Sequence, residues 1–356
     1  MKITVQPIEP DRRREPPSDF GFGNTFTNHM FKQTYTKGEG WHDAAICPYE
    51  ALSLMPATAT LHYGQAFFEG LKAYRRPDGN INLFRPWENM KRFNRSAVRL
   101  AAPEVDEEEH LDALIKLIEM DHEWVPSADG ASLYIRPFMF ASEAALGVHA
   151  SHEYMHLIIL SPVGFYFTDG LTPISVFISD KYRRAVLGGT GDIKAAGNYA
   201  ASLYVSEEVA KQGYSQVLWL DAIHGRYVEE VGAMNIAFVY GDHIVTPALS
   251  GSILPGVTRD SILKLAPDLG YTVEEASIDI TELLTDIKAG KVTEAFGIGT
   301  AAVVIPVGNF GYQGEDYSVN GIQVGPVTEH LFKALTDIQF GRVPDERGWT
   351  LTIETP

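Results

Sequence analysis

The chain has 356 residues, of which 45% are hydrophobic and 21% are charged. These proportions are those of a globular protein, and the length exceeds what one hydrophobic core usually serves, so two domains are expected. The formal net charge of −17 disfavours nucleic acid and anionic lipid as partners, because an acidic surface repels phosphate groups. One cysteine, Cys47, excludes an intrachain disulfide, and no apolar run is long enough to span a bilayer. We therefore expect a cytoplasmic protein with no membrane partner.

The N-terminal half alternates short apolar runs with two helical patterns. Its first ~20 residues are polar and proline-rich and are typical of an extended arm rather than a secretory signal. A helix is predicted over residues 87–98, with Arg95 near its end, and a second helix is predicted after the acidic run 106–109. Apolar residues recur at helical spacing in both: Met90, Phe93 and Ala97 in the first, and Leu111, Leu114, Ile115 and Ile118 in the second.

A turn-rich segment, 167–173, is the best candidate for a domain boundary. We therefore predict a smaller N-terminal α/β domain at 1–165, an interdomain loop at 166–173, and a larger C-terminal domain at 174–356 that contains Lys194. Interleaved helices and strands indicate an α+β (mixed α/β) fold. Beyond the boundary we predict strands at 174–178, 216–220, 236–240 and 294–298, helices at 198–211, 258–265 and 281–289, and a hairpin turn at Gly241-Asp242.

Lys194 lies in a glycine-rich stretch, 188–199, just before a predicted helix. On its own this segment favours a flexible surface loop with a solvated lysine. A Walker-type phosphate loop is excluded, because Ile193 precedes the lysine and Ala195 follows it. Glycine-rich backbone around a lysine also suits a pyridoxal phosphate site, which needs in addition an acid for the pyridine nitrogen, a phosphate seat and a partner for the phenolic oxygen.

Three features are candidates for the phosphate seat. Residues 254–260 place a turn before a helix, where free N–H groups and the Thr258 hydroxyl can bind an anion; the alternative is an ordinary helix start. Residues 297–301 end a strand in small residues, where backbone can close on a ligand or simply turn. Arg95 can clamp a phosphate or form a surface ion pair.

Two adjacent carboxylates, Glu229 and Glu230, lie in a β-like stretch. Alternation sends one to each face, so one of them can be buried. A buried carboxylate is costly unless it is paired. Glu230 beside a pyridinium would be paired.

Eight motifs that include these segments resemble, in order, those of the branched-chain aminotransferases, enzymes of the fold-type IV pyridoxal phosphate family. The most specific is YGQAFFEGLKAY at 63–74, and the matches extend from about Phe22 to Val307. The resemblance implies the two-domain D-amino-acid-aminotransferase-like fold. The other motifs are residues 22–23 with 26–30, 95–97, 134–137, the Lys194 segment, 230–235, 254–259 and 297–301.

The resemblance implies a role for each matched residue. Lys194 would hold pyridoxal 5′-phosphate as an internal aldimine and would carry the proton. Tyr199 would bond to the phenolic oxygen and Glu230 to the pyridine nitrogen. The phosphate would be held by Arg95, the backbone at Val257 and Thr258, and Thr300. The substrate would be bound by Phe68, Tyr63, Tyr134, Arg136, the backbone of Thr300 and Ala301, and Tyr166 on the interdomain loop.

The implied reaction is ping-pong transamination of L-leucine, L-isoleucine and L-valine with 2-oxoglutarate, giving the branched-chain 2-oxo acids and L-glutamate, as in branched-chain amino acid biosynthesis. A homodimer is implied and no metal is expected. Aromatic residues would take the apolar side chain and Arg136 a carboxylate; which residue binds which carboxylate stays open. The sequence departs from common family patterns at Ala196 and Ala233. Ala302 and Ile305 replace a redox Cys-x-x-Cys pair, so thiol regulation is not expected.

Three alternatives remain. A D-amino-acid aminotransferase or an aminodeoxychorismate lyase would share the lysine and the phosphate seat. A metal-binding protein could use His149, His152 and His156, with Glu153 nearby, although solvated loop histidines are favoured. A non-catalytic binding protein of the same fold is disfavoured, because it would not need Lys194, Tyr199 and Glu230 together.

Overall fold

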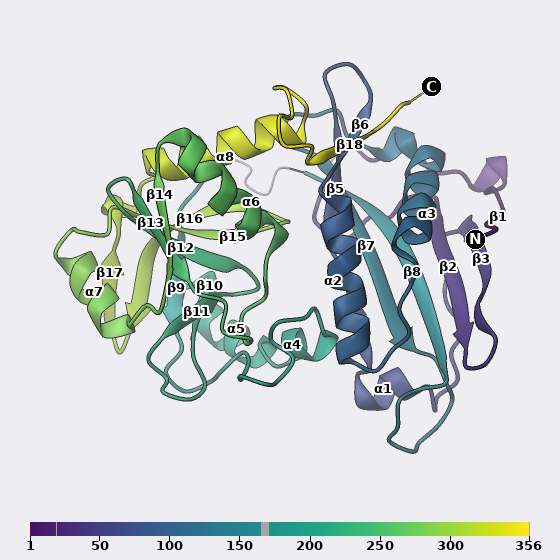
Figure 1. Cartoon of the computed structure of the whole chain (residues 1–356), viewed down its shortest axis with the longest axis horizontal. Helices are drawn as coiled ribbons and strands as arrows, with labels where there is room; N and C mark the ends of the chain where they lie inside the picture. Colours follow the sequence, from purple (N-terminus) through teal and green to yellow (C-terminus); the bar gives the residue numbers. More distant parts are fainter. Residues whose placement is uncertain (19, 165–170, 356) are drawn as a thin grey trace. The chain divides into compact units, whose positions relative to one another are not determined.

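The structure is a computed structural model that describes residues 1–18, 20–164 and 171–355 (Figure 1). Its chain divides into two compact units. The first unit comprises Met1–Tyr166, Ile193–Gly197 and Asp337–Pro356, and the second comprises Phe167–Asp192 and Asn198–Thr336. The predicted division put residues 193–197 and 337–356 in the C-terminal domain and made that domain the larger, whereas both stretches belong to the first unit, which contains more residues than the second. Ala195 bridges Phe67 of the first unit, and the strand at 350–353 pairs with the strand at 81–84.

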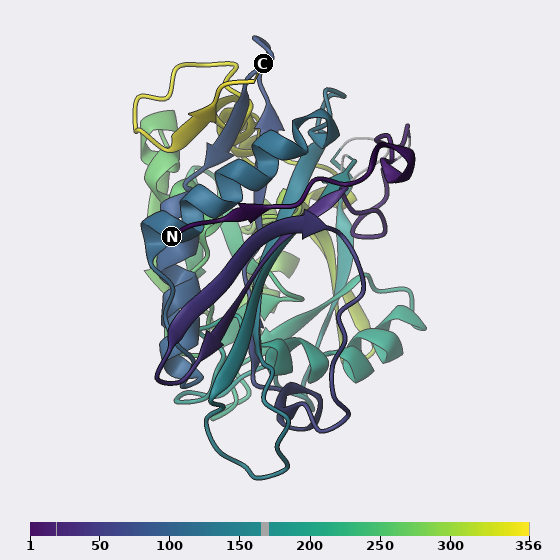
Figure 2. The same cartoon turned by 90° about the vertical axis from the view of Figure 1, so that its right-hand side faces the viewer.

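The first unit is built on a nine-stranded sheet in the order β1-β3-β2-β8-β7-β5-β6-β18, with β4 pairing with β7. All neighbours are antiparallel except β1 and β3, which lie side by side and run parallel (Figure 2). The C-terminal strand β18 pairs with β6, and Ala195 forms an isolated bridge with Phe67 of β4. The strands are β1 (Thr4–Val5), β2 (His29–Thr36), β3 (Gly40–Pro48), β4 (Ala66–Phe68), β5 (Leu71–Arg75), β6 (Ile81–Phe84), β7 (Ser132–Ala141), β8 (Glu153–Val163) and β18 (Thr350–Ile353).

Two helices, α2 (Pro86–Arg99) and α3 (Glu107–Met120), cover one face of this sheet. The predicted apolar face of α2 is confirmed, because Met90, Phe93 and Ala97 are fully buried. In α3 the buried stripe is Ala113, Leu114, Leu117 and Ile118, whereas Leu111 and Ile115 are only partly buried. The acidic run supplies the cap of α3, where the Asp106 side chain accepts a hydrogen bond from the Glu109 N–H. The unit also contains α1 (Ala59–Tyr63) and the short 3-10 helices η1 (Pro10–Arg12) and η2 (His122–Trp124).

The second unit has its own nine-stranded sheet, in the order β11-β10-β9-β16-β15-β12-β13-β14, with β17 pairing with β16. The strands predicted at 174–178 and 216–220 are confirmed to the residue, and the predicted hairpin joins β12 to β13 with Gly241 at φ +72°. The strands are β9 (Ile174–Ile178), β10 (Gln216–Leu220), β11 (Val228–Val231), β12 (Asn235–Tyr240), β13 (His243–Pro247), β14 (Thr272–Ala276), β15 (Glu294–Gly299), β16 (Val303–Tyr312) and β17 (Glu315–Ser318).

Helix α7 (Ile280–Lys288) packs its buried face into the core of this sheet, and its start is capped by Asp279, which accepts hydrogen bonds from two N–H groups of the first turn. The single helix predicted at 198–211 is wrong, because the chain forms α4 (Ala196–Ala200) and α5 (Leu203–Ala210) with a turn between them. No helix of the described residues is both long and apolar enough to cross a membrane. The remaining helices are α6 (Val257–Leu265), η3 (Ala266–Leu269), η4 (Asn320–Ile322) and α8 (Pro326–Gln339).

Candidate active site

The backbone of Lys194 is anchored to two elements of the first unit. Its carbonyl accepts a hydrogen bond from the Phe68 N–H at 3.2 Å, next to the bridge between Phe67 and Ala195. Its own N–H donates to the Ser96 hydroxyl of α2 at 3.3 Å. The segment alone favoured a flexible loop, but hydrogen bonds to β4 and α2 hold the backbone of Lys194 in a defined position.

The Lys194 side chain lies beside an aromatic and cationic cluster. Its Nζ lies 5.0 Å from the centre of the Phe68 ring, and the Arg136 guanidinium lies 4.4 Å from the same ring. Arg136 also donates from Nη2 to the Tyr134 hydroxyl at 3.0 Å. These residues share one face of the sheet because strand residues alternate: Leu133 and Ile135 of β7 pack in the core with the helices, so Tyr134 and Arg136 point to the opposite face.

Gly70 makes room for the tyrosine of this cluster. A Cβ built at Gly70 would overlap the Tyr134 hydroxyl. The glycine after Phe68-Glu69 in the sequence motif is thus explained by a close side-chain approach rather than by a turn. Any larger residue there would displace Tyr134.

Directly behind Phe68, Glu69 forms a buried ion pair with Arg92 of α2. Arg92 donates from Nε to Oε1 at 2.7 Å and from Nη2 to Oε2 at 2.8 Å, and Asn89 donates to Oε2 at 2.9 Å. Glu69 is fully buried and Arg92 is 5% exposed. Burial by itself would raise the pKa of Glu69, but the charge and hydrogen bonds of Arg92 outweigh it and hold the pKa below its usual value. Because Glu69 follows Phe68 directly in the chain, this ion pair also restrains the backbone position of Phe68.

In the second unit, the buried carboxylate of Glu230 is held from two sides. The Arg184 guanidinium lies 2.5 Å from Oε2, and the Asn235 side chain donates to Oε1 at 3.1 Å. Both partners are held in turn. Arg184 donates to the carbonyls of Gly191 and Ser252, and Asn235 donates to the carbonyl of Leu254 at 2.9 Å.

Sequence reasoning missed Arg184 and Asn235. Arg184 lies 46 residues before Glu230 in a loop, where no periodicity marks it, whereas Asn235 was part of a matched motif and received no role. Asn235 also explains Gly256, because a Cβ at Gly256 would overlap its Oδ1 atom. The carboxylate, the asparagine and the turn before α6 are therefore packed as one group.

The predicted phosphate residues of this unit gather near that group. Helix α6 begins at Val257 after the extended Gly256, and the first N–H groups of a helix have no partners within the helix. Thr300 follows β15, and the register of β12 with β15 places Asn235 opposite Ile298. The Thr300 turn and the start of β12 therefore lie at the same end of the sheet. A helix start and a threonine at this end provide donors for an anion.

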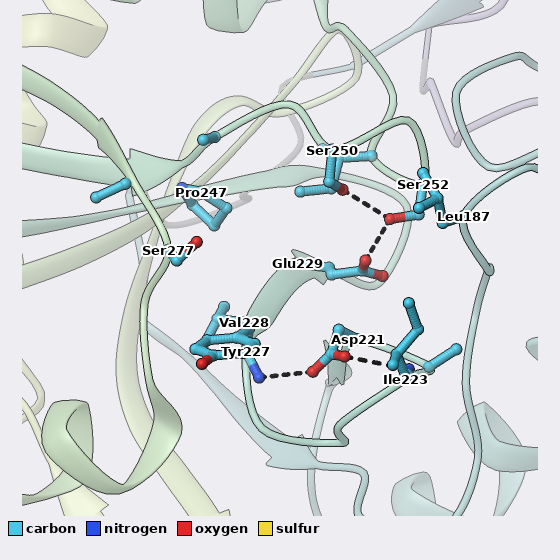
Figure 3. A pocket seen from close by; sticks show the side chains of 14 residues that line it. Leu187, Asp221, Ile223, Tyr227, Val228, Glu229, Pro247, Ser250, Ser252 and Ser277 are labelled. Atoms are coloured by element: carbon cyan, nitrogen blue, oxygen red, sulfur yellow. Dashed lines mark hydrogen bonds between the residues drawn. The ribbon is translucent and has the colours of Figure 1, made fainter.

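Glu229 lies on the other side of β11 and faces a separate cavity of about 170 Å³ (Figure 3). Both carboxylates are buried, at 5% and 2% exposure, where the alternation argument expected one. The Ser252 hydroxyl donates to Oε1 of Glu229, while Oε2 has no hydrogen-bond partner among the described residues. Burial raises the pKa of Glu229, and the Ser252 hydrogen bond offsets this only in part. Ser252 links the two carboxylates, since its carbonyl accepts from Arg184.

Other predicted residues stand apart from these groups. Arg95 lies on the exposed side of α2, one residue before the Ser96 that binds Lys194. Tyr63, at the end of α1, is 43% exposed and donates from its hydroxyl to the Leu146 carbonyl. Tyr199 is partly buried in α4. Tyr166 lies outside the described residues.

The histidine group predicted as an alternative has different members in the structure. His156 is fully buried in β8, where it hydrogen-bonds Gln33 and packs on His110, and burial holds its pKa well below the usual value. It cannot join the two loop histidines. Glu143, rather than Glu153, meets His149 and His152.

Comparison with known proteins identifies the class to which this fold and these residues belong. The model of the family described as "Amino-transferase class IV" matches residues 66–310. The chain belongs to this family. It is 50% identical over 343 residues to "Branched-chain-amino-acid transaminase 1" of Bacillus subtilis, covering 96% of each chain. It is 48% identical over 352 residues to "Probable branched-chain-amino-acid aminotransferase" of Staphylococcus aureus, covering 99% of this chain and 98% of that one.

Solved structures agree in fold. The branched-chain amino acid aminotransferase from Escherichia coli matches with a TM-score of 0.72 and 28% identity, over 90% of this chain and 98% of that one. The T.th. branched-chain amino acid aminotransferase with pyridoxamine 5′-phosphate matches with a TM-score of 0.74 and 27% identity, over 90% and 97%. The predicted resemblance and the mixed α/β fold-type IV class are thus confirmed.

Proposed function

We propose that this protein transfers the amino group of L-leucine, L-isoleucine and L-valine to 2-oxoglutarate in a ping-pong reaction that uses pyridoxal 5′-phosphate. The names of its relatives support the substrate class, and the family together with a relative that contains pyridoxamine 5′-phosphate supports the cofactor. A homodimer in the cytoplasm remains part of this proposal.

The residues present fit the cofactor in three respects. Glu230 is a buried carboxylate with fixed orientation, as a protonated ring nitrogen requires. The first turn of α6 supplies N–H donors of the kind that bind phosphate, with the Thr258 hydroxyl in the same turn. Lys194 is a lysine with an anchored backbone beside an aromatic ring.

The bound cofactor supplies an electron sink for the Cα–H bond of the substrate. Lys194 would remove the proton from the substrate Cα as a base and would then deliver it, as an acid, to the cofactor carbon that shares the amino nitrogen. Glu230 would accept a hydrogen bond from the ring nitrogen and would keep a proton there, while Arg184 holds the Glu230 carboxylate in place. Tyr199 would donate to the phenolic oxygen. The phosphate would be held by Arg95, the N–H groups of Val257 and Thr258, and Thr300.

One observation supports substrate choice within this family: the cluster of Phe68, Tyr134 and Arg136 around Lys194. The Phe68 ring offers an apolar surface for a branched side chain. The Arg136 guanidinium offers a planar fork for a carboxylate. Tyr63, Tyr166 and the backbone at Thr300 and Ala301 complete the proposed substrate residues.

A spectroscopic experiment tests the proposal. The purified protein, saturated with pyridoxal phosphate, is mixed with L-leucine, L-isoleucine or L-valine, and the loss of cofactor absorbance in the visible is followed. We expect bleaching by all three, recovery of the colour with 2-oxoglutarate, and loss of both reactions in Lys194→Ala with the fold intact by circular dichroism. Bleaching by D-alanine but not by L-leucine would instead favour a D-amino-acid aminotransferase and overturn the substrate assignment.

A further inference from the structure

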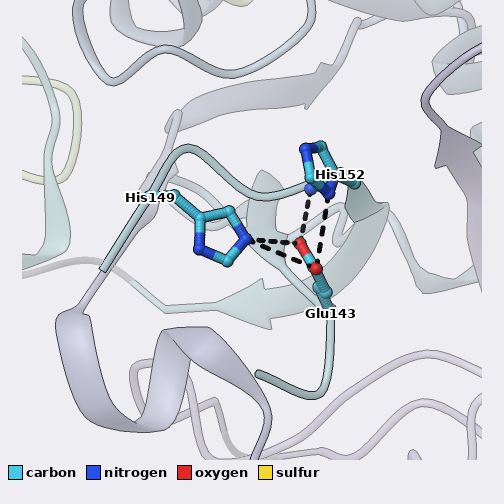
Figure 4. A group of neighbouring side chains, drawn as sticks. All are labelled: Glu143, His149 and His152. Atoms are coloured by element: carbon cyan, nitrogen blue, oxygen red, sulfur yellow. Dashed lines mark hydrogen bonds and ion pairs between the residues drawn. The ribbon is translucent and has the colours of Figure 1, made fainter. Parts of the chain in front are cut away.

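Three potential metal ligands meet in the loop that joins β7 to β8, residues 142–152. Glu143 lies at the start of the loop and His149 and His152 near its end, and Figure 4 shows both imidazoles turned toward the carboxylate. Each residue offers one ligand atom, and the three atoms lie within 4.8 Å of one another. None of the three has a role in the proposed transamination.

The distances from each histidine nitrogen to the carboxylate oxygens of Glu143 are those found between ligands of one ion. His149 Nε2 lies 3.4 Å from Oε1 and 3.2 Å from Oε2 of Glu143, and His152 Nδ1 lies 3.4 Å from Oε1. A tetrahedral ion with bonds of about 2.0–2.1 Å separates its ligand atoms by about 3.3–3.4 Å. A charge-assisted hydrogen bond would bring these atoms to about 2.7–2.9 Å. The nitrogen–oxygen distances are therefore longer than those of strong direct hydrogen bonds and leave room for an ion between each imidazole and the carboxylate, while the three ligand atoms all lie within 4.8 Å of one another.

Hydrogen bonds hold the Glu143 carboxylate in place before any ion binds. Oε2 of Glu143 accepts a hydrogen bond from the His152 N–H at 2.7 Å and one from the Ser151 hydroxyl at 3.4 Å. The backbone of Glu143 is fixed as well, because its carbonyl accepts from the Ala59 N–H at 2.8 Å. Such outer contacts orient metal ligands and increase affinity.

The site is also open enough to be filled. The side chains of Glu143, His149 and His152 are 21%, 39% and 50% exposed. An ion can therefore enter from solvent, and a water molecule can complete four ligands. Two imidazoles and one carboxylate are a ligand set of zinc and of other divalent transition metals, whereas Ca²⁺ and Mg²⁺ prefer oxygen ligands alone.

We propose that Glu143, His149 and His152 form a binding site for one divalent transition-metal ion. Zn²⁺ is the ion used to test this site. The ion closes the loop between Glu143 and His149, and this closed segment contains Leu146. The Leu146 carbonyl accepts the hydrogen bond from Tyr63. Metal binding would therefore stiffen the support of a residue that the proposed function places at the substrate, and this consequence alone rests on that function.

The test is a Zn²⁺ titration of the holoenzyme, carrying no affinity tag, against a chromophoric chelator. We expect one ion per chain with a dissociation constant in the micromolar range or tighter, weakened by at least about tenfold in His149→Ala, in His152→Ala and in Glu143→Gln. Co²⁺ at the same site should give the visible absorption of a tetrahedral complex. His243→Ala is the matched control, because His243 is also part of an exposed histidine–carboxylate pair, at 3.0 Å from Glu274, and should leave binding unchanged.

The double variant His149→Ala/His152→Ala keeps the cofactor and so accounts for ions that the cofactor phosphate captures. Hydrogen exchange of backbone amides locates the ion: Zn²⁺ should slow exchange in residues 143–152 of the wild type and not in the double variant. Absence of saturable Zn²⁺ binding, equal affinity in the double variant, or binding with unchanged exchange in the loop would each overturn the proposal. These measurements do not depend on turnover, so a failure of the proposed transamination would not affect them.

Discussion

The buried pair of Glu69 and Arg92 predicts an asymmetric pattern of stability. Arg92→Met removes two charge-assisted hydrogen bonds and leaves a fully buried carboxylate that still accepts from the Asn89 amide and the Gly70 N–H. Breaking a buried pair from one side costs about 3–5 kcal/mol, because one charge stays buried without its partner. The double variant Glu69→Leu/Arg92→Met removes both charges. Its main cost is the loss of the Glu69 acceptor by the Gly70 N–H and by the Asn89 amide, which keeps only the Gly70 carbonyl at 3.4 Å. An unsatisfied buried donor costs about 1–3 kcal/mol.

Lowering the pH should reduce the difference in free energy of unfolding between the wild type and Arg92→Met. In the wild type the pKa of Glu69 is lowered in the folded state, so this group contributes stability above its ordinary pKa, and that contribution is lost as pH falls through the lowered value. Without Arg92, burial is the largest cause acting on the pKa and is opposed only by the Lys194 charge and the Asn89 hydrogen bond. We therefore expect the pKa to rise, so that the folded variant takes up a proton more readily than the unfolded chain. Its stability relative to wild type therefore improves as pH falls from 7 toward 5.

Urea unfolding at both pH values measures these differences, followed by tryptophan fluorescence and by circular dichroism. Coincidence of the two curves is the check that a single transition is being measured. We expect the double variant to be more stable than Arg92→Met at neutral pH. The single variant Glu69→Leu is measured as well. The reasoning would be refuted if the double variant lost as much free energy of unfolding as Arg92→Met and Glu69→Leu together, or if Arg92→Met were destabilised by the same amount at both pH values.

Two further predictions concern the proposed site. Gly70→Ala should push the Tyr134 ring out of place and reduce kcat/KM for leucine, by up to about 100-fold for a displacement near 1 Å, with little change in the urea midpoint of unfolding. Gly79→Ala is the control, because Gly79 has open space around it but a φ of +91°; it should lower the urea midpoint and leave kcat/KM unchanged. An equal loss of kcat/KM in both variants would contradict the contact argument. Arg184→Met should weaken pyridoxal phosphate binding by at least about tenfold, the value of one charge-assisted hydrogen bond. Arg183→Met is the control and should leave cofactor binding unchanged, because the Arg183 guanidinium bonds to the carbonyls of Asp221 and Ser179. If both variants retained the same amount of cofactor after dialysis, Arg184 would have no positioning role.

Residue type and spacing within a short segment were enough to predict several strands and helices. The strands at 174–178 and 216–220 are short apolar runs, rich in β-branched and aromatic residues, bounded by turn residues, and the structure reproduces their limits. Helix α8 was not predicted, although Val327, Leu331 and Leu335 recur at helical spacing after Pro326 at the helix start, so the pattern was available.

Contacts between distant residues could not be predicted in the same way. Glu230 was identified from its motif, but Arg184 reaches it through a loop with no repeating pattern. Likewise, histidine spacing suggested His156 and Glu153 for a metal group. In the structure β8 buries His156, and the turn of the loop brings Glu143 to the other two histidines. Side-chain alternation and loop closure decide such groups, and both depend on the folded sheet.

The pairing of β18 with β6 sets the order in which the first unit can be completed. Strands β6 and β18 lie side by side (Figure 1). The Thr352 hydroxyl donates to the side-chain oxygen of Asn82, a residue 270 positions earlier in the chain. At synthesis rates of about 5–20 residues per second, roughly 15–50 s separate the emergence of these two strands from the ribosome. During that time β6 presents an open edge, which can pair with other chains. The unit that begins first is therefore finished last, and the β6 edge stays without its β18 partner until residues 350–353 have been made.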